Sequence, residues 1–314
     1  MKSYKRPFFL FNAHLETIYP ALFRSVAIPQ PKSVRITTPD DDFLDYDWYH
    51  KEGNSKVVII SHGLEGNSKR AYVRGMARAF IQRDFDVVAW NYRGCSDEMN
   101  SQLRFYHSGA TDDLSTLVDY ISELEYTSIY LIGFSLGGNL TLKYLGEQGS
   151  SLNTKIQKTV AFSVPLNLHT SCLEISKPSN SVYTFRFLRS LKKKIMIKAK
   201  QRNDLPVENL HRIKNLIDFD DAYTAPLHGF SSAIDYYTKC SSINFIDRID
   251  IPTLIINAKN DPFLSPECYP KSDNKNLALW FPEKGGHVGF TNFHRNGLYW
   301  SEDQALKFIL SNNV

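Results

Sequence analysis

Apolar residues occur along the chain in two patterns, as short runs rich in β-branched residues and as longer stretches with helical spacing. The short runs indicate strands and the longer stretches indicate amphipathic helices. We predict strands at residues 57–61, 86–91, 128–133, 158–163, 253–258 and 277–281, and helices at 69–83, 111–124, 136–148, 230–239 and 301–310. Strands and helices that alternate in this way predict an α/β fold, with a mostly parallel central sheet flanked by helices.

Two stretches depart from this alternation. Residues 33–50 alternate on either side of a turn-like segment at 39–42, which predicts an antiparallel hairpin at the sheet edge. From about 165 to 229 the chain contains no convincing core strand, so we expect an inserted helical cap there. We predict a single domain over 1–314, with its core at 30–164 and 230–314, a cap at about 165–229, and an N-terminal segment, 1–29, that packs on the core.

The sequence Gly133-Phe134-Ser135-Leu136-Gly137 follows a predicted strand and opens a predicted helix. A G-x-S-x-G in this setting is typical of a sharp strand-turn-helix elbow that exposes a serine nucleophile. The two glycines have a steric reason, because so tight a turn leaves little room for side chains two residues before and after the serine. We therefore predict that Ser135 is the nucleophile.

A serine hydroxyl needs a base to take its proton and an acid to orient that base. Asp261 follows the apolar strand at 253–258, and His287 follows the next predicted strand. The chain order Ser, Asp, His is that of α/β-hydrolases. We predict Asp261 as the acid and His287 as the base. The rival candidates fit less well, since two precede their strand and one lies farther along the chain: Asp247, Asp250 and His294.

Acyl transfer also needs donors for the oxyanion of the tetrahedral intermediate, and backbone amides can supply them. The residue after the nucleophile, Leu136, is one candidate. The other is Leu64, in the loop that leaves the strand at 57–61 through His62-Gly63. His62 is expected to shape this loop or to form hydrogen bonds rather than to act as a second base.

The string from His107 to Asp112 fits the pattern H-x-x-x-x-D, which occurs in some acyltransferases but also arises often by chance. We favour a simpler interpretation, in which Thr111 or Asp112 caps the helix that follows.

The predicted cap holds eight Lys or Arg between Phe185 and Arg202. Apolar residues recur there with the spacing of one helical face, at Leu188, Leu191, Ile195 and Ala199. The favoured interpretation is a solvated cap helix packed on the core, and the alternative is a lid that senses acyl chains or an anionic surface.

Composition narrows the class of protein. The net charge of +4 is too small and too dispersed for a dedicated nucleic-acid binder. The cysteines lie far apart without metal-ligand spacing, which favours free thiols in a reducing compartment and no metal site: Cys95, Cys172, Cys240 and Cys268. We also expect no integral membrane segment and no signal peptide, and hence a cytoplasmic protein.

Several motifs together resemble the YheT-like α/β-hydrolases. They are NAHLETIYP from residue 12, HGLEGNS from 62, NYRGCSDEMN from 91, YHSGATDDL from 106, GFSLGGNLTLKYLGE from 133, DPF from 261 and GGHVGF from 285. The resemblance implies carboxylic-ester hydrolysis, with the same Ser135, Asp261 and His287 in the catalytic roles. One departure is Asp97, where the family usually has glycine, and this leaves the shape and charge of the loop at 93–100 open.

The expected function is therefore hydrolysis of short- to medium-chain acyl esters through an acyl-enzyme, without a metal or organic cofactor. The substrate would be a small-molecule or lipid-like ester, and the basic cap is a candidate for weak contact with a membrane surface. The N-terminal segment would line or cover an acyl pocket, or serve core packing.

Two alternatives stay open, an acyltransferase that passes the acyl group to an alcohol, and a non-catalytic binding protein on a hydrolase scaffold. A dinucleotide site is disfavoured because no G-x-G-x-x-G follows a predicted strand.

Overall fold

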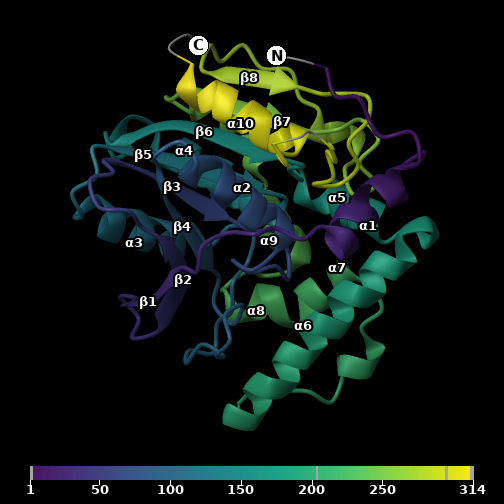
Figure 1. Cartoon of the computed structure of the whole chain (residues 1–314). Coiled ribbons are helices and arrows are strands. Elements are labelled where there is room, and N and C mark those ends of the chain that lie inside the picture. The colour runs from purple at the N-terminus through teal and green to yellow at the C-terminus, as the bar shows by residue number, and fades with distance from the viewer. Residues whose placement is uncertain (1–2, 203, 294–295, 312–314) are drawn as a thin grey trace.

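The computed structural model of the chain describes residues 3–202, 204–293 and 296–311. It is built around one eight-stranded sheet in the order β1-β2-β4-β3-β5-β6-β7-β8 (Figure 1). The strands are β1 Lys32–Thr37, β2 Phe43–Tyr49, β3 Lys56–Ser61, β4 Asp86–Asn91, β5 Ser128–Phe134, β6 Ile156–Phe162, β7 Thr253–Ile256 and β8 Leu277–Trp280. β2 runs antiparallel to β1 and β4, and all other neighbours are parallel. The predicted mostly parallel sheet and its antiparallel edge hairpin are confirmed.

Helices cover both faces of the sheet, as predicted. They are α1 Ala13–Phe23, α2 Ala71–Ile81, α3 Thr111–Ser122, α4 Leu136–Gln148, α5 Leu168–Ile175, α6 Ser181–Gln201, α7 Leu216–Phe219, α8 Ala225–Leu227, α9 Ala233–Cys240 and α10 Trp300–Leu310. Of these, α1, α5, α7 and α8 have no counterpart among the individually predicted helices, although the last three lie within the predicted helical cap.

The two faces of the sheet follow from the two-residue period of its strands. On β3, Val58 and Ile60 point to the side covered by α2 and α10. Val57 and Ile59 point to the other side, where α3 and α4 pack. Because both faces are covered, β3 and β4 are continuous apolar runs rather than alternating ones.

Between β6 and β7 the described residues form α5 to α9 and short turns, without a strand. The long helix α6 runs along the lower right of the molecule in Figure 1. Its apolar face is buried in a separate cluster with α7 and the loop before α3, through Leu188, Leu191 and Ile195. Among the described helices, none has the length and low polarity needed to cross a bilayer.

The predicted capping of α3 is wrong. Its N-cap residue is Ala110, and no side chain caps the helix. Thr111 and Asp112 lie inside the first turn, where Thr111 donates to Glu147 and Asp112 accepts from Arg104 at 2.8 Å. An acidic side chain in the first turn still interacts favourably with the helix dipole.

The loop at 93–100 is held by charges. The exposed Asp97 pairs with Lys69, whose Nζ lies 2.6 Å from Oδ2. Arg93 is buried and pairs with Asp42 and Asp113 at 2.9 and 2.7 Å. Asp97 therefore adds a surface ion pair, and the buried Arg93 anchors the start of the loop.

Candidate active site

The serine of the G-x-S-x-G motif lies at the turn between β5 and α4. Ser135 has φ 54° and ψ −120°, a conformation that costs energy for a residue with a side chain. A Cβ on Gly133 would lie 2.5 Å from the carbonyl oxygen of Gly137, and one on Gly137 would lie 2.4 Å from the carbonyl oxygens of Ser61 and His62. The sequence folds into this elbow because glycine is the only residue that fits on either side of the serine.

Ser135, His287 and Asp261 form a continuous line of hydrogen bonds. The distance from His287 Nε2 to Ser135 Oγ is 2.9 Å, and that from His287 Nδ1 to Asp261 Oδ2 is 2.8 Å. Asp261 is buried, and its Oδ1 also accepts from the Phe263 amide at 2.9 Å. The Phe263 ring packs on the imidazole, with a distance of 4.2 Å between the ring centroids. In this arrangement a proton can pass from the serine hydroxyl to the imidazole.

The rival acids lie elsewhere. Asp247 and Asp250 precede β7, and Asp247 accepts a hydrogen bond from Ser272. His294 lies outside the described residues.

Both predicted oxyanion donors border the space beside Ser135. A Cβ on Gly63 would lie 3.2 Å from the Cβ of Ser135, so the loop that carries Leu64 packs against the serine. No described residue accepts a hydrogen bond from the Leu64 amide. That amide can therefore donate to an oxyanion bound at the serine.

The other histidines near the elbow have structural partners. His62 is fully buried, and its Nδ1 lies 2.8 Å from the carbonyl oxygen of Gly63. Burial lowers the pKa of His62 to about 3, so its ring is neutral at neutral pH. Burial also holds the pKa of His107 well below its usual range. Its Nδ1 accepts from the Gly109 amide, and Asp112 pairs with Arg104, so the H-x-x-x-x-D string does not form one site.

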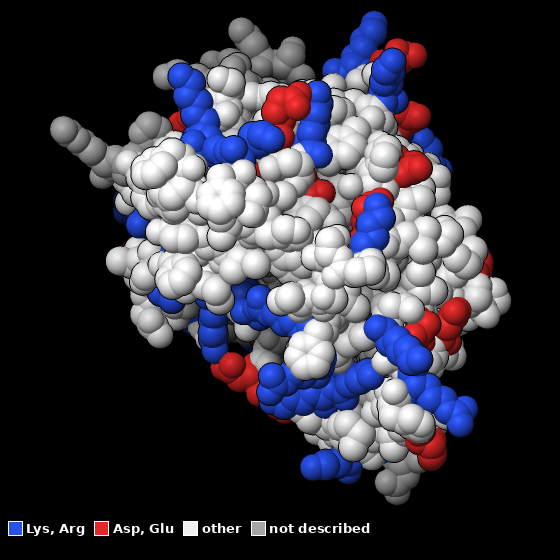
Figure 2. Space-filling view, turned by 90° about the vertical axis from the view of Figure 1, so that its right-hand side faces the viewer, with Lys and Arg blue, Asp and Glu red and all other residues white. Residues whose placement is uncertain are grey.

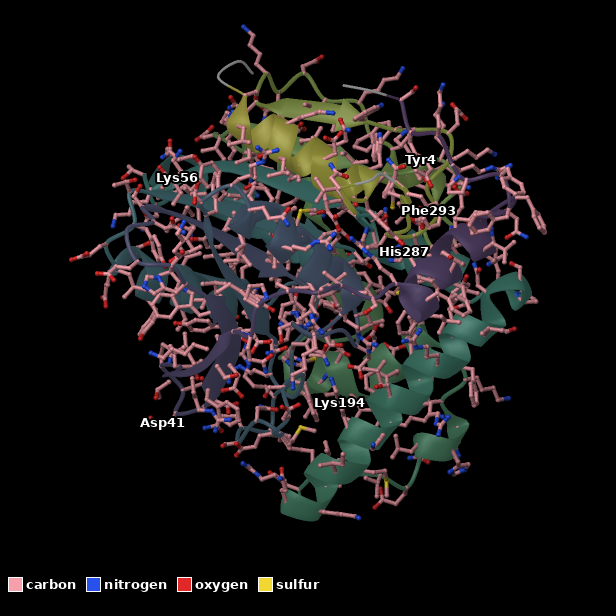
Figure 3. All side chains as sticks on the ribbon, in the orientation of Figure 1. Tyr4, Asp41, Lys56, Lys194, His287 and Phe293 are labelled. Carbon is pink, nitrogen blue, oxygen red and sulfur yellow. The ribbon has the colours of Figure 1, made fainter. Side chains whose placement is uncertain are left out.

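Helix α1 holds the loop that carries the histidine, which the sequence did not predict. Thr17 Oγ1 accepts from the His287 amide at 2.9 Å and donates to the Ala13 carbonyl at 2.7 Å. The fully buried Glu16 accepts from Asn260, whose Oδ1 accepts from the Gly286 amide at 3.1 Å. Figure 3 shows His287 beside α1. The motif NAHLETIYP, which contains both α1 residues, is the signal that could have identified them.

Two cavities, of about 110 and 210 Å³, meet at Ser135. The smaller has a mainly apolar lining that includes Leu136, Leu168, Ile175, Leu191, Ile195 and Phe219. The larger opens between α1 and α6 and has a more polar lining that includes Arg70, Tyr72, Tyr183, Arg186, Ser190 and Tyr299. A molecule that reacts with the serine can therefore place an apolar part on one side and a polar part on the other.

Largely shielded ions connect α6 to the loop that carries Leu64. Lys194 Nζ donates to Glu65 Oε1 at 2.7 Å, and Ser190 donates to the other oxygen of Glu65. Tyr106 also donates to Glu65 Oε1, at 2.7 Å. Farther along α6, the buried Lys198 donates to the carbonyl of Gln102 at 2.6 Å. Lys194 and Lys198 thus have structural partners, whereas the favoured interpretation, a solvated cap helix packed on the core, left the basic face of this helix in water.

Comparisons with known proteins identify the family and the fold. The family model of the alpha/beta hydrolase fold matches residues 56–292. YheT of Escherichia coli is 35% identical to the chain, over 89% of this chain and 84% of YheT. Monoacylglycerol lipase of Saccharomyces cerevisiae is 29% identical, over 87% of this chain and 62% of the lipase. The solved structure of the Pyrococcus furiosus esterase Pf2001 has a TM-score of 0.60 at 20% identity, over 91% of this chain and 95% of that structure.

The contact between Thr17 and the His287 amide gives a testable prediction. Replacing Thr17→Val keeps the shape of the side chain but leaves the amide without its acceptor, which costs about 1–3 kcal/mol. We expect a lower free energy of unfolding in urea and slower labelling of Ser135 by a fluorophosphonate probe. Thr17→Ser keeps the hydroxyl and is the matched control, so it should label at close to the wild-type rate. Equal labelling of the valine variant and the wild type would contradict a positioning role for Thr17.

Proposed function

The chain belongs to the α/β-hydrolase fold family and to its YheT-like members, which makes it an enzyme of the esterase and lipase type, and we propose that it is a serine carboxylesterase. The observation that carries this proposal is the hydrogen-bonded line from Ser135 through His287 to Asp261 at the junction of two cavities. A small-molecule or lipid-like acyl ester is the proposed substrate.

In the proposed reaction, Ser135 Oγ attacks the carbonyl carbon of the ester while His287 Nε2 takes its proton. Asp261 holds the imidazole in the tautomer with the proton on Nδ1 and stabilises the imidazolium. The amides of Leu136 and Leu64 donate to the oxyanion. His287 then protonates the leaving alcohol, and an acyl group remains bonded to Ser135. Water, activated by His287, attacks this acyl-enzyme and releases the acid. Apart from the ester and water, these steps use side chains and amides of the chain itself.

The two cavities support an assignment of the two halves of the ester. The apolar cavity suits an acyl chain, because burial of its methylene groups is favourable there. The larger cavity, with its arginines, suits the alcohol half. We further propose that residues 165–229 act as the cap of a single domain. The N-terminal segment closes the alcohol side through the α1 residues that line the larger cavity: Thr17, Ile18, Pro20, Ala21 and Leu22. All four cysteines are free, which supports a reducing, cytoplasmic location.

The proposed function is tested by hydrolysis of p-nitrophenyl esters from acetyl to palmitoyl. We expect turnover to peak at a short or medium chain and to fall at least about 10⁴-fold in Ser135→Ala, since the nucleophile is lost. Thr141→Ala, a hydroxyl lost inside the neighbouring helix, is a control for general effects on folding. If wild type and Ser135→Ala were equally inactive on every ester, hydrolysis would be the wrong chemistry.

Product analysis in the presence of ethanol separates hydrolysis from acyl transfer. The two reactions share the acyl-enzyme and differ in whether water or alcohol resolves it. We expect free acid as the main product, and a predominance of ethyl ester would instead support the acyltransferase.

A further prediction concerns chain length. Cys172 lines the apolar cavity and is one of its smaller side chains. Cys172→Phe should fill part of the cavity and lower kcat/KM for medium-chain esters by about tenfold, a steric loss of about 1.4 kcal/mol, with little change for acetyl esters. Cys172→Ser, which keeps the volume, is the control. An equal loss on short and medium chains would show that this cavity does not hold the acyl chain.

A further inference from the structure

A cluster of apolar side chains is exposed at the N-terminal segment and α1. Phe8 is 92% exposed, Phe23 69% and Phe293 59%. We call this the aromatic surface, made of Phe8, Phe9, Phe11, Leu22, Phe23 and Phe293. Such residues are normally scattered on a monomer, and a contiguous group of them indicates an interaction site.

Four rings of the aromatic surface, together with Tyr19, form a continuous group. The ring of Phe9 lies 5.6 Å from Phe8, 5.4 Å from Tyr19 and 5.9 Å from Phe293, measured between centroids. Tyr19 in turn lies 5.3 Å from Phe23. The N-terminal segment and α1 therefore form one surface with Phe293, which lies far from them in the sequence, and Figure 3 shows Phe293 on the same side of the molecule as α1.

Exposed cations accompany this surface. Lys5 is exposed shortly before Phe8 in the chain. Arg186 lines the larger cavity together with Leu22, and on α6 it is exposed with Arg189 and the apolar Val182 and Phe185. Figure 2 looks onto this side of the molecule and shows a broad uncharged area with Lys and Arg above and below it and fewer acidic side chains. Aromatic rings bordered by cations are typical of proteins that bind at the interface of anionic lipids.

The aromatic surface leads to the candidate active site. Leu22 and Arg186 line the larger cavity together with Ser135 and His287. A layer that contacts Leu22 and Phe23 would therefore lie at the mouth of that cavity. Phe8, Phe11 and Phe23 are each exposed by two thirds or more, and a fluid lipid interface accommodates such exposed rings without the close shape match that a rigid protein partner requires.

We propose that the aromatic surface docks on an anionic phospholipid bilayer, with its rings among the head groups and with Lys5, Arg186 and Arg189 against the lipid charges. The inference is independent of the proposed chemistry, because the surface is defined without reference to the reaction. The sequence predicted a membrane contact for the basic cap alone, and this proposal adds the N-terminal segment to that contact.

The test is flotation of the full chain with vesicles of phosphatidylcholine alone or mixed with phosphatidylglycerol. We expect binding to the mixed vesicles at low salt, and loss of binding as salt screens the charges. Phe8→Ser/Phe23→Ser should weaken binding at least about tenfold, since two exposed rings lose their apolar contact. Tyr120→Ser/Leu310→Ser removes two exposed apolar side chains from α3 and α10 and should bind like wild type.

Three results would overturn the proposal: no binding of the wild type to mixed vesicles, equal binding of the Phe8→Ser/Phe23→Ser variant, or a dimer in size-exclusion chromatography that this variant dissociates. The last result would assign the surface to a second copy of the chain. The variant should still hydrolyse soluble p-nitrophenyl acetate at the wild-type rate, because neither ring lines a cavity at Ser135. An inactive wild type that still binds vesicles would therefore contradict the proposed function alone.

Discussion

The close approach of Gly137 to the end of β3 is the constraint on which the rest of the site depends. No side chain fits between this residue and the carbonyl oxygens of Ser61 and His62. β3 and β5 are parallel neighbours with Ser61 opposite Gly133, so their exit loops leave the sheet side by side. This contact places Leu64 and Leu136 beside one serine. β7 and β8 run parallel to these strands and end at the same edge, which brings Asp261 and His287 to Ser135.

The cap helix is fixed by polar groups as well as by apolar packing. Removing Lys194 and Glu65 from water is costly, and the cost is offset only because each finds partners: Lys194 contacts Glu65, and Glu65 also accepts from Ser190 and Tyr106. Burial lowers the pKa of Lys198 to about 8, and its ammonium donates to the carbonyl of Gln102. These hydrogen bonds fix the direction and the distance between the groups, whereas apolar packing alone would allow the helix to slide. They hold α6 in one position relative to Leu64.

The sequence predicted the features that depend on local rules. Strand periodicity, the glycines of the elbow and the order Ser, Asp, His together named three residues that lie in hydrogen-bond contact. These local rules failed where contacts between distant parts of the chain determine the structure. The buried positions of α1 are Glu16, Thr17 and Pro20, so the helix has no apolar stripe on its inner face to indicate it. Lys194 and Lys198 likewise read as solvated from their charge, because their partners Glu65 and Gln102 lie 129 and 96 residues away in the chain.

Helix α1 has two faces with different tasks. Its inner face binds the His287 amide through Thr17 and, through Glu16 and Asn260, the Gly286 amide. Its outer face carries Leu22 and Phe23 to solvent. A helix of 11 residues is marginal by itself, so α1 and the histidine loop stabilise each other. Any partner that binds the outer face only when α1 is formed also favours the ordered histidine loop, and by linkage the ordered loop favours that partner. Contact at the surface and geometry at Ser135 therefore belong to one equilibrium.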